Sequence, residues 1–365
     1  MNHLEACLTI NSLPGVGWHR SIQLVSHFGS AKAVLEASPE KWITVEGLGE
    51  KACISLSKWK QELPKVQRQI KELERYAVRP LFYGSPDYPL ALGYCPDAPL
   101  VLFTKGTLQF KKQPIISIVG TRTSSAHGRD FCRQLIEKIR PFQPIICSGL
   151  ARGIDIVAHR TALEEGLETI ACLGHGFDRI YPPSHQKEAH QIEKQGLLVT
   201  DFLPNSEFHR ANFPRRNRLI AGMSHATVVI ESAVEGGSMN TANLAHQYGR
   251  ELFAVPGRPS DVKSGGCHQL IVQQKAQLLT DPVILIEALG WKEQPPLKSV
   301  QRAFFQSLSE EEEQLYKKLS QAPKIHLDAL AMKLGWPISH TASILLQMEM
   351  KGLVRALPGK HFEWI

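Results

Sequence analysis

The stretch Ile115–Ser125, IISIVGTRTSS, joins a short apolar run to a turn of small and polar residues. The β-branched residues of Ile115–Val119 favour a buried strand. The turn Gly120–Ser125 follows this strand directly, and Arg129–Arg140 then carries apolar residues at helical spacing. A buried strand that enters a helix through such a turn is the repeating unit of a parallel sheet.

The same unit recurs along the chain. Further strands are expected at Leu100–Phe103, Ile145–Cys147, Thr169–Leu173, Leu197–Asp201, Thr227–Glu231 and Leu252–Val255. Helices are expected between and after them, at Asp155–Glu165, His185–Gln195, Arg218–Met223, Met239–Tyr248 and Pro282–Leu289. Because short buried strands alternate with helices, we expect an α/β fold, a Rossmann-like, doubly wound and mostly parallel sheet covered on both faces.

The segment before this region is predicted to be helical, with two similar turns. Leu13–Gly17 and Val45–Gly49 both read apolar-x-Gly-apolar-Gly before a helical stretch. Glycines there permit positive φ and leave backbone N–H groups open at a helix N-terminus, which suits a phosphate. The turns resemble those of helix-hairpin-helix (SAM-like) DNA-binding modules, but they also suit plain helix connectors.

The C-terminal segment is expected to form a winged helix. Helices are predicted at Glu311–Leu319, Leu327–Lys333 and His340–Met350, followed by two strands within Leu353–Ile365 that turn at Pro358-Gly359. The third helix has only Lys351 near its end and lacks side chains for base reading, which favours a protein-contact module. The expected domains are therefore 1–80 helical, 81–290 Rossmann-like, 291–308 a linker and 309–365 a winged helix.

Composition excludes several classes of protein. The net charge of +7 is spread as +3 over residues 1–80, +3 over 81–310 and +1 over 311–365, so no basic tail is present. The apolar runs are too short to cross a bilayer, and Met1–Ile10 lacks the basic start of a signal peptide, so no membrane partner is expected. Seven widely spaced cysteines without a CxxC pair favour reduced thiols in a cytoplasmic protein.

The turns after the strands share small residues and arginines. In an open parallel sheet these turns meet at one edge, where ligands bind. Backbone N–H groups, hydroxyls and the planar fork of arginine all suit phosphate oxygens. Glycines at such turns can be purely structural, but that does not account for the arginines beside them. The predicted phosphate-binding residues are Gly120, Thr121, Arg122, Ser148, Gly149, Arg152, Gly153, Arg215, Arg216, Asn217, Arg218, Gly237, Ser238 and Thr241.

Common catalytic sites are poorly supported. No G-x-x-x-x-G-K-[ST] loop is present, and the first turn lacks the later glycines of a dinucleotide fingerprint, so no cofactor is expected. The histidines have no HxxxH or HExxH spacing, which argues against a metal. Asp155 and His159 share a helix face, although such a pair is more often structural than a general base. Glu231, at a strand end, is a further acid/base candidate.

The segment Tyr83–Leu289 resembles the DNA-processing protein A family (DprA/Smf). The motifs that carry the resemblance are Ile118–Thr123, Ser148–Asp155 with His159, Thr169–Gly176, Tyr181-Pro182, Phe213–Gly222, Gly249-Arg250 and Ala254–Gly257. Where the family often has a basic residue after Tyr-Pro, Pro183 stands here, and His185 or Lys187 is the expected substitute. Arg122 matches the arginine of the family's Gly-Ser-Arg turn.

The resemblance implies a non-catalytic mediator of natural transformation and competence. Such a protein would bind single-stranded DNA in a basic pocket, protect the incoming strand, form a homodimer, load a RecA-type recombinase and displace single-strand-binding protein. Tyr181, Phe177 and Phe213 are candidates for base stacking. The alternative is an enzyme, a Rossmann-like phosphoribohydrolase of nucleoside monophosphates. Such an enzyme would use a Pro-Gly-Gly-x-Gly-Thr-x-x-Glu segment. Gly236–Thr241 matches that segment only in part, and Leu244 stands where the glutamate would be.

Overall fold

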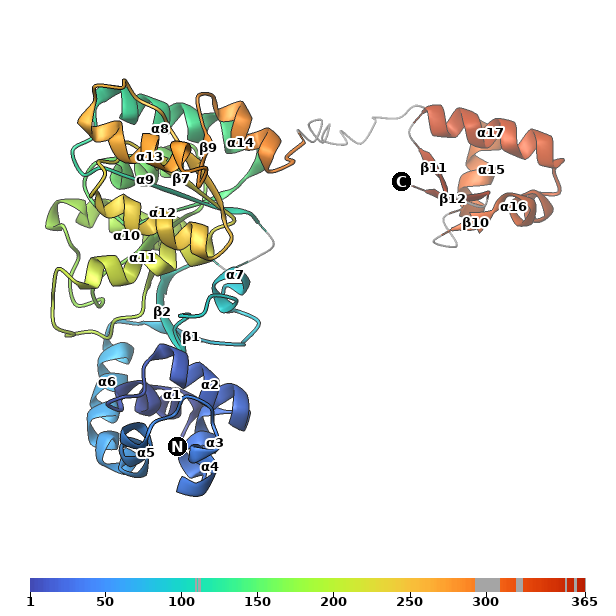
Figure 1. The fold of residues 1–365 in the computed structure, drawn as a ribbon. Coiled ribbons are helices and arrows are strands. Elements are labelled where there is room, and N and C mark those ends of the chain that lie inside the picture. The colour runs from blue at the N-terminus through green and yellow to red at the C-terminus, as the bar shows by residue number, and fades with distance from the viewer. Residues whose placement is uncertain are drawn as a thin grey trace. The chain divides into compact units, whose positions relative to one another are not determined.

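The computed structural model describes residues 1–108, 110, 113–292, 309–319, 324–351, 353–357 and 360–364. The chain forms two compact units, residues 1–293 and 294–365 (Figure 1). None of the helices in the described ranges has the length and apolar character that a bilayer crossing needs.

A nine-stranded sheet, counted over the described residues, organises the first unit. Its order is β1-β2-β6-β5-β4-β3-β7-β8-β9. β1 and β2 pair antiparallel, as do β2 and β6, and the remaining pairs are parallel. The strands are β1 Arg79–Phe82, β2 Val101–Gly106, β3 Ile115–Gly120, β4 Ile145–Ser148, β5 Thr169–Cys172, β6 Leu197–Thr200, β7 Ala226–Ile230, β8 Glu251–Ala254 and β9 Gln277–Leu278.

The connections wind in both directions from β3, which confirms the doubly wound fold. From β3 the chain proceeds through β4 and β5 to β6, and then returns to place β7 on the other side of β3. The carboxyl ends of β3 and β7 therefore flank the point where the strand order reverses. In open α/β sheets this is where a ligand crevice forms.

Helices cover both faces of the sheet. Alternate residues of β3 belong to different cores: Ile116 and Ile118 pack in one, and Ile115 and Val119 in the other. Helices α8 (Ala126–Ile139), α9 (Ile154–Glu164), α10 (Gln186–Gln195) and α14 (Pro282–Ala288) contribute to the cores on one face. Helices α7 (Leu90–Gly93), α11 (Asn212–Met223), α12 (Gly237–Gln247) and α13 (Gly265–Val272) contribute to the other.

Two features differ from the sequence prediction. Helix α11 begins at Asn212, so the arginine-rich run Arg215–Arg218 lies within the helix and not in a loop that leads to it. The strands β1 and β9 and the helices α7 and α13 were not predicted. β9 spans two exposed residues, and so short a segment has no readable periodicity.

The N-terminal helices contain both predicted hairpin turns. They are α1 His3–Ser12, α2 Trp18–Phe28, α3 Ala31–Glu36, α4 Pro39–Ile43, α5 Glu50–Ser57 and α6 Leu63–Arg75. Gly15 and Gly47 have φ values of 78° and 77°, and Arg20 links the turns by donating to the Gly15 carbonyl oxygen at 2.7 Å and to that of Gly47 at 3.2 Å.

The helices form one core with the edge of the sheet. Val101 and Phe103 of β2 pack among the buried residues of α1, α2 and α6. The N-terminal helices and the sheet therefore belong to one compact unit, and one hydrophobic core extends across the expected boundary near residue 80.

The second unit has the winged-helix arrangement that the sequence predicts. It contains α15 (Glu310–Leu319), α16 (Leu327–Leu334) and α17 (Ile338–Met350). A sheet of order β10-β12-β11 joins Ile325–His326, His361–Trp364 and Val354–Leu357. The predicted turn at Pro358-Gly359 and residues 293–308 of the predicted linker lie outside the described residues.

Candidate functional site

A cavity of about 690 Å³ lies at the carboxyl ends of β3 and β7. Eight of the predicted phosphate-binding residues line it: Gly120, Thr121, Arg122, Arg216, Asn217, Gly237, Ser238 and Thr241. Six others are not in its walls: Ser148, Gly149, Arg152, Gly153, Arg215 and Arg218. Lys187, the expected substitute for the basic residue after Tyr-Pro, is not in its walls either. The structure thus brings together the turns after β3 and β7 and part of α11.

Several of the conspicuous glycines are required by packing. A β-carbon at Gly120 would lie 2.0 Å from the Ile230 carbonyl oxygen, and one at Gly153 would lie 2.0 Å from that of Thr121. Gly153 also has φ of +81°, which side chains rarely adopt. Gly237, in contrast, has open space around its α-carbon. Of these three, Gly237 is the one that leaves room for a ligand.

The guanidinium of Arg216 is buried inside the sheet edge. It donates to the Gly149 carbonyl oxygen at 2.7 Å and to that of Cys172, and so ties α11 to the ends of β4 and β5. Burial lowers the pKa of Arg216, and the charge of Asp155 opposes that shift. Burial raises the pKa of Asp155, and Arg216 in turn opposes this shift. A β-carbon at Gly149 would lie 2.6 Å from the guanidinium, so glycine is needed there.

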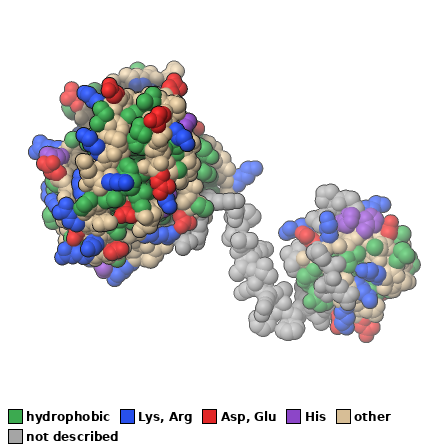
Figure 2. All heavy atoms as spheres, turned by 90° about the horizontal axis from the view of Figure 1, so that it is seen from below, with side chains coloured by type: hydrophobic (Ala, Val, Ile, Leu, Met, Phe, Trp, Pro, Cys, Tyr) green, Lys and Arg blue, Asp and Glu red, His purple; other side chains and the backbone are tan. Residues whose placement is uncertain are grey.

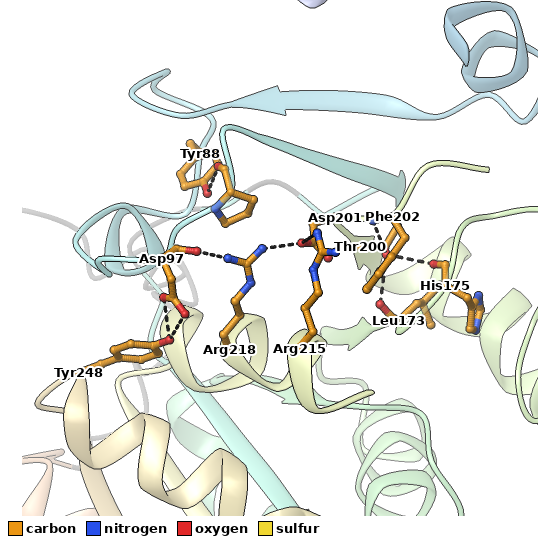
Figure 3. A network of polar contacts seen from close by, with 11 residues as sticks. Tyr88, Asp97, Leu173, His175, Thr200, Asp201, Phe202, Arg215, Arg218 and Tyr248 are labelled. Carbon is orange, nitrogen blue, oxygen red and sulfur yellow. Dashed lines mark hydrogen bonds and ion pairs between the residues drawn. The ribbon is translucent and has the colours of Figure 1, made fainter. Parts of the chain in front are cut away.

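Arg218 is also a structural residue. Its side chain is 3% exposed and forms an ion pair with Asp201, and it donates to the Asp97 carbonyl oxygen (Figure 3). Arg215 lies beside it, 3.3 Å from Asp201, with its guanidinium over Trp18 and Phe202. The prediction that Arg218 contacts phosphate is therefore wrong in its geometry, because the guanidinium is already paired and buried outside the cavity.

Two other predicted residues face away from the cavity. The Ser148 hydroxyl is buried and donates to the Ile118 carbonyl oxygen at 2.6 Å. Lys187 lies on α10 and lines a different hollow with Arg160 and Lys194. The other expected substitute, His185, is buried 2.9 Å from the Leu150 carbonyl oxygen. None of the three is positioned to contact an anion in the cavity.

The N-terminus of α8 already holds a carboxylate. Glu231 accepts hydrogen bonds from the Ser125 N–H at 2.8 Å and from the Ser125 hydroxyl. Ser125 in turn caps the helix by accepting from the Gly128 N–H at 3.0 Å. A dinucleotide or nucleotide phosphate at this end of α8 would be repelled by the Glu231 carboxylate. The capping contacts also give Glu231 a structural role in place of the acid/base role considered from the sequence.

The N-terminus of α12 is open by comparison. Its N-cap residue, Gly236, provides no side-chain hydrogen bond, and Gly236, Gly237 and Ser238 line the cavity. The backbone N–H groups and the helix dipole favour an anion at this point. Ser238 and Thr241 are nearly buried, and the Ser238 hydroxyl lies 2.8 Å from that of Ser232.

An aromatic cluster forms the opposite wall. Tyr181, Phe208 and Phe213 pack with ring centroids 5.0 to 5.8 Å apart. The exposed guanidinium of Arg122 lies 5.7 Å from the Phe213 ring centre. Phe208 was missed in the sequence, as was Arg210 beside it in the cavity wall, because the segment before α11 has no strand–turn signal.

His175 positions Tyr181 in this wall. Its Nε2 accepts a hydrogen bond from the Tyr181 N–H at 3.2 Å, so its Nδ1 carries the proton that is donated to the Gly176 carbonyl oxygen at 2.8 Å. Burial lowers the pKa of His175, which favours this neutral form.

Asp155 and His159 have separate hydrogen-bond partners. Asp155 accepts a hydrogen bond from the Gly149 N–H at 3.2 Å, whereas His159 Nδ1 lies 2.8 Å from the Thr169 hydroxyl. Burial lowers the pKa of His159 to about 3. His159 is fully buried, and Asp155 is 6% exposed where it lines the cavity, so the contacts favour the structural interpretation of the pair.

Surface charge alone does not mark a site. On the face shown in Figure 2, Lys and Arg side chains are interspersed with acidic and apolar ones. Among the described residues, no cluster of three or more His, Cys, Asp or Glu side chains could hold a metal ion.

Comparison with known proteins identifies the family. The family described as DNA recombination-mediator protein A matches residues 79–290, and the DprA winged helix domain matches residues 305–360. The chain belongs to the DprA/Smf family.

Individual members are similar over most of their length. The Smf protein of Synechocystis is 30% identical over 98% of this chain and 97% of its own, and that of Escherichia coli is 35% identical over 75% and 74%. The X-ray structure of DprA from Streptococcus pneumoniae aligns with a TM-score of 0.69 at 28% identity, over 79% of this chain and 98% of that one. A structure of Helicobacter pylori DprA, described for its single-stranded DNA binding mode, aligns with a TM-score of 0.52 at 26% identity, over 58% and 95%.

For this DprA/Smf chain, Arg216→Met should lower the free energy of unfolding by about 3 to 5 kcal/mol. The change leaves two strand-end carbonyls and buried Asp155 without their partner. Urea unfolding followed by circular dichroism measures the loss. Arg152→Met, at an exposed position, is the control and should change stability by less than about 0.5 kcal/mol. Equal stability of the two variants would contradict the structural role of Arg216.

The unfolding free energy should also fall as the pH drops from 6.5 towards 3. In this window His159 becomes protonated in the unfolded chain but stays neutral in the folded protein, because burial lowers the pKa of the folded imidazole from 6.5 to about 3. His159→Gln should reduce the slope by up to about 1.4 kcal/mol per pH unit, as urea unfolding at several pH values would measure. His127→Gln, at an exposed position on α8, should leave the slope unchanged. Identical slopes in all three proteins would show that His159 is not held neutral.

Proposed function

We propose that this protein binds single-stranded DNA in the cavity between β3, β7 and α11. The observation that carries the proposal is the position of Arg122, whose exposed guanidinium lies beside the aromatic cluster Tyr181–Phe208–Phe213. A cation for the phosphate and rings for the bases thus stand next to each other. That combination is typical of proteins that bind single strands without sequence readout.

The open N-terminus of α12 supports a second phosphate contact. The N–H groups near Gly237 lack a side-chain cap, and the space around Gly237 admits a ligand close to the backbone. Thr121 and Asn217 add polar groups to the same cavity. Together with Arg122 these groups offer hydrogen-bond donors to phosphate oxygens in the cavity.

The aromatic wall favours a single strand over a duplex. Bases in a duplex are stacked on one another and present their faces to no protein group, whereas an unpaired base can stack on an exposed ring. Tyr181 is 43% exposed, so one ring of the cluster is accessible for this contact.

We further propose that the protein acts as a non-catalytic cytoplasmic mediator that protects incoming DNA and loads a RecA-type recombinase as a homodimer. Membership of the DprA/Smf family supports this role, as does the likeness to a Helicobacter pylori protein described for its single-stranded DNA binding. Displacement of single-strand-binding protein belongs to the same proposal, because the recombinase and that protein compete for one strand.

The phosphoribohydrolase alternative has less support. Its segment needs a glutamate where Leu244 stands, and Leu244 packs against the core on α12. Glu231, the residue directly after β7, is bound to Ser125. Release of a free base from a nucleoside monophosphate would nevertheless favour the enzyme over the binding protein.

Arg122→Ala should weaken binding to single strands of every sequence, because a phosphate contact carries no sequence information. The slope of log affinity against log salt should become shallower by about 0.7, the value for one phosphate contact on a single strand. Fluorescence anisotropy with labelled single-stranded and duplex oligonucleotides, over about 50 to 200 mM salt, measures both effects.

Arg133→Ala is the matched control. Arg133 is an exposed arginine on α8 that pairs with Asp130 at 2.7 Å, so its removal changes the net charge by the same amount away from the cavity. Its binding curves should overlay those of the unmodified protein. Equal losses in both variants, or duplex binding as tight as single-strand binding, would overturn the proposed site.

A further inference from the structure

The turn between β3 and α8 is fixed at both of its ends. At the first end, the Thr121 N–H donates to the Glu231 carbonyl oxygen at 2.7 Å. At the other end, the Ser125 N–H donates to the Glu231 carboxylate at 2.8 Å. Residues 122–124 stand between these two anchors, and Arg122 is the first of them. The orientation of Arg122 therefore depends on how the middle of the turn is held.

A side chain from a distant segment holds the middle of this turn. The Nζ of Lys263 donates to the Thr123 carbonyl oxygen at 2.7 Å, across 140 residues of sequence. Thr123 follows Arg122 directly and is exposed to solvent. The next carbonyl oxygen, that of Ser124, accepts from Arg129 at 2.6 Å, but Arg129 belongs to the adjoining helix α8. Lys263 is thus the residue that ties the middle of the turn to another part of the fold.

The segment that carries Lys263 is itself anchored to the wall of the cavity. Lys263 lies in the short 3₁₀ helix η4, Val262–Ser264, and the Asp261 side chain caps this helix by accepting from the Lys263 N–H at 3.0 Å. Directly after η4, the Gly266 N–H donates to the carbonyl oxygen of Ser232, a residue that lines the cavity, at 2.7 Å. Residues 261–266 therefore contact both turns that frame the cavity, the one after β3 and the one after β7.

Lys263 is placed to act on the turn and not on a ligand in the cavity. It is not among the residues that line the cavity, whereas Arg122 is. A cation whose backbone is already fixed loses less conformational freedom when it binds a phosphate, and this gain appears as affinity. The hydrogen bond to Thr123 supplies such a restraint beside Arg122.

We propose that Lys263 is a positioning residue for single-stranded DNA binding, because its hydrogen bond to Thr123 holds Arg122 in the orientation that meets a phosphate. This inference rests on the proposed function, and it gives the segment after β8 a part in binding. Since Lys263 acts through Arg122, its effect on affinity depends on the presence of the Arg122 guanidinium.

Lys263→Met removes the donor and keeps the length of the side chain. Affinity for single strands should fall about two- to tenfold, the range expected for one hydrogen bond. In protein that already carries Arg122→Ala, the same change should cause no further loss, because residues that act as a unit are not additive. Fluorescence anisotropy over about 50 to 200 mM salt measures the affinity and the salt slope of the unmodified protein, both single variants and the double variant.

Two further variants separate the hydrogen bond from charge in general. Lys263→Arg keeps a donor that can reach a carbonyl oxygen and should retain most of the affinity. Lys138→Met removes the same charge from an exposed position in the last turn of α8, the end of that helix away from Arg122, and should bind as the unmodified protein does.

A further loss in the Arg122→Ala background, with a salt slope shallower by about another 0.7, would show that Lys263 contacts phosphate itself and would overturn the positioning role. Unchanged affinity of Lys263→Met contradicts the inference, as does an equal loss in Lys263→Arg or in Lys138→Met. In each of these cases Arg122→Ala still weakens binding, so the proposed function stands. If Arg122→Ala binds as tightly as the unmodified protein, the proposed function fails and this inference fails with it.

Discussion

The buried guanidinium of Arg216 holds helix α11 against the ends of β4 and β5. Its hydrogen bonds to the Gly149 and Cys172 carbonyl oxygens satisfy acceptors at the sheet edge, where strand pairing has ended. The carboxylate of Asp155 offsets the positive charge of Arg216. Because α11 carries Phe213 and Asn217 into the cavity, the geometry of the site depends on this one buried cation.

The arginines of α11 differ in how far they are committed to holding the fold together. Arg216 anchors the helix to the sheet, and Arg218 pairs with Asp201 and stacks on Trp18, with its guanidinium 3.6 Å from the ring centre. Arg215 remains partly exposed beside them. Buried charges tolerate little change, since removal of one partner leaves the other without compensation. Arg122 is exposed and has no such structural role, so it is better suited than Arg216 or Arg218 to contact a ligand.

The placement of acidic groups is as informative as that of the arginines. Glu231 occupies the N-terminus of α8, the position where nucleotide-binding sheets of this kind often hold a phosphate, whereas the N-terminus of α12 is open. This arrangement favours an anion at α12 and the aromatic wall over one at the first strand–helix turn. The sheet topology alone does not decide between a binding protein and a cofactor-binding enzyme, because one topology supports both.

The sequence by itself determined the alternation of strands and helices, the two hairpin turns and the winged helix, because local periodicity and glycine placement encode them. It also indicated the edge of the sheet where the turns meet. It could not distinguish exposed Arg122 from buried Arg216 and Arg218, because the same residue type serves both roles and only packing decides its burial. The sequence did not predict that Phe208 and Arg210 line the cavity, because they lie in a segment without a regular sequence pattern. The hydrogen bond from Lys263 to Thr123 joins residues 140 positions apart, a long-range contact that only the tertiary structure decides.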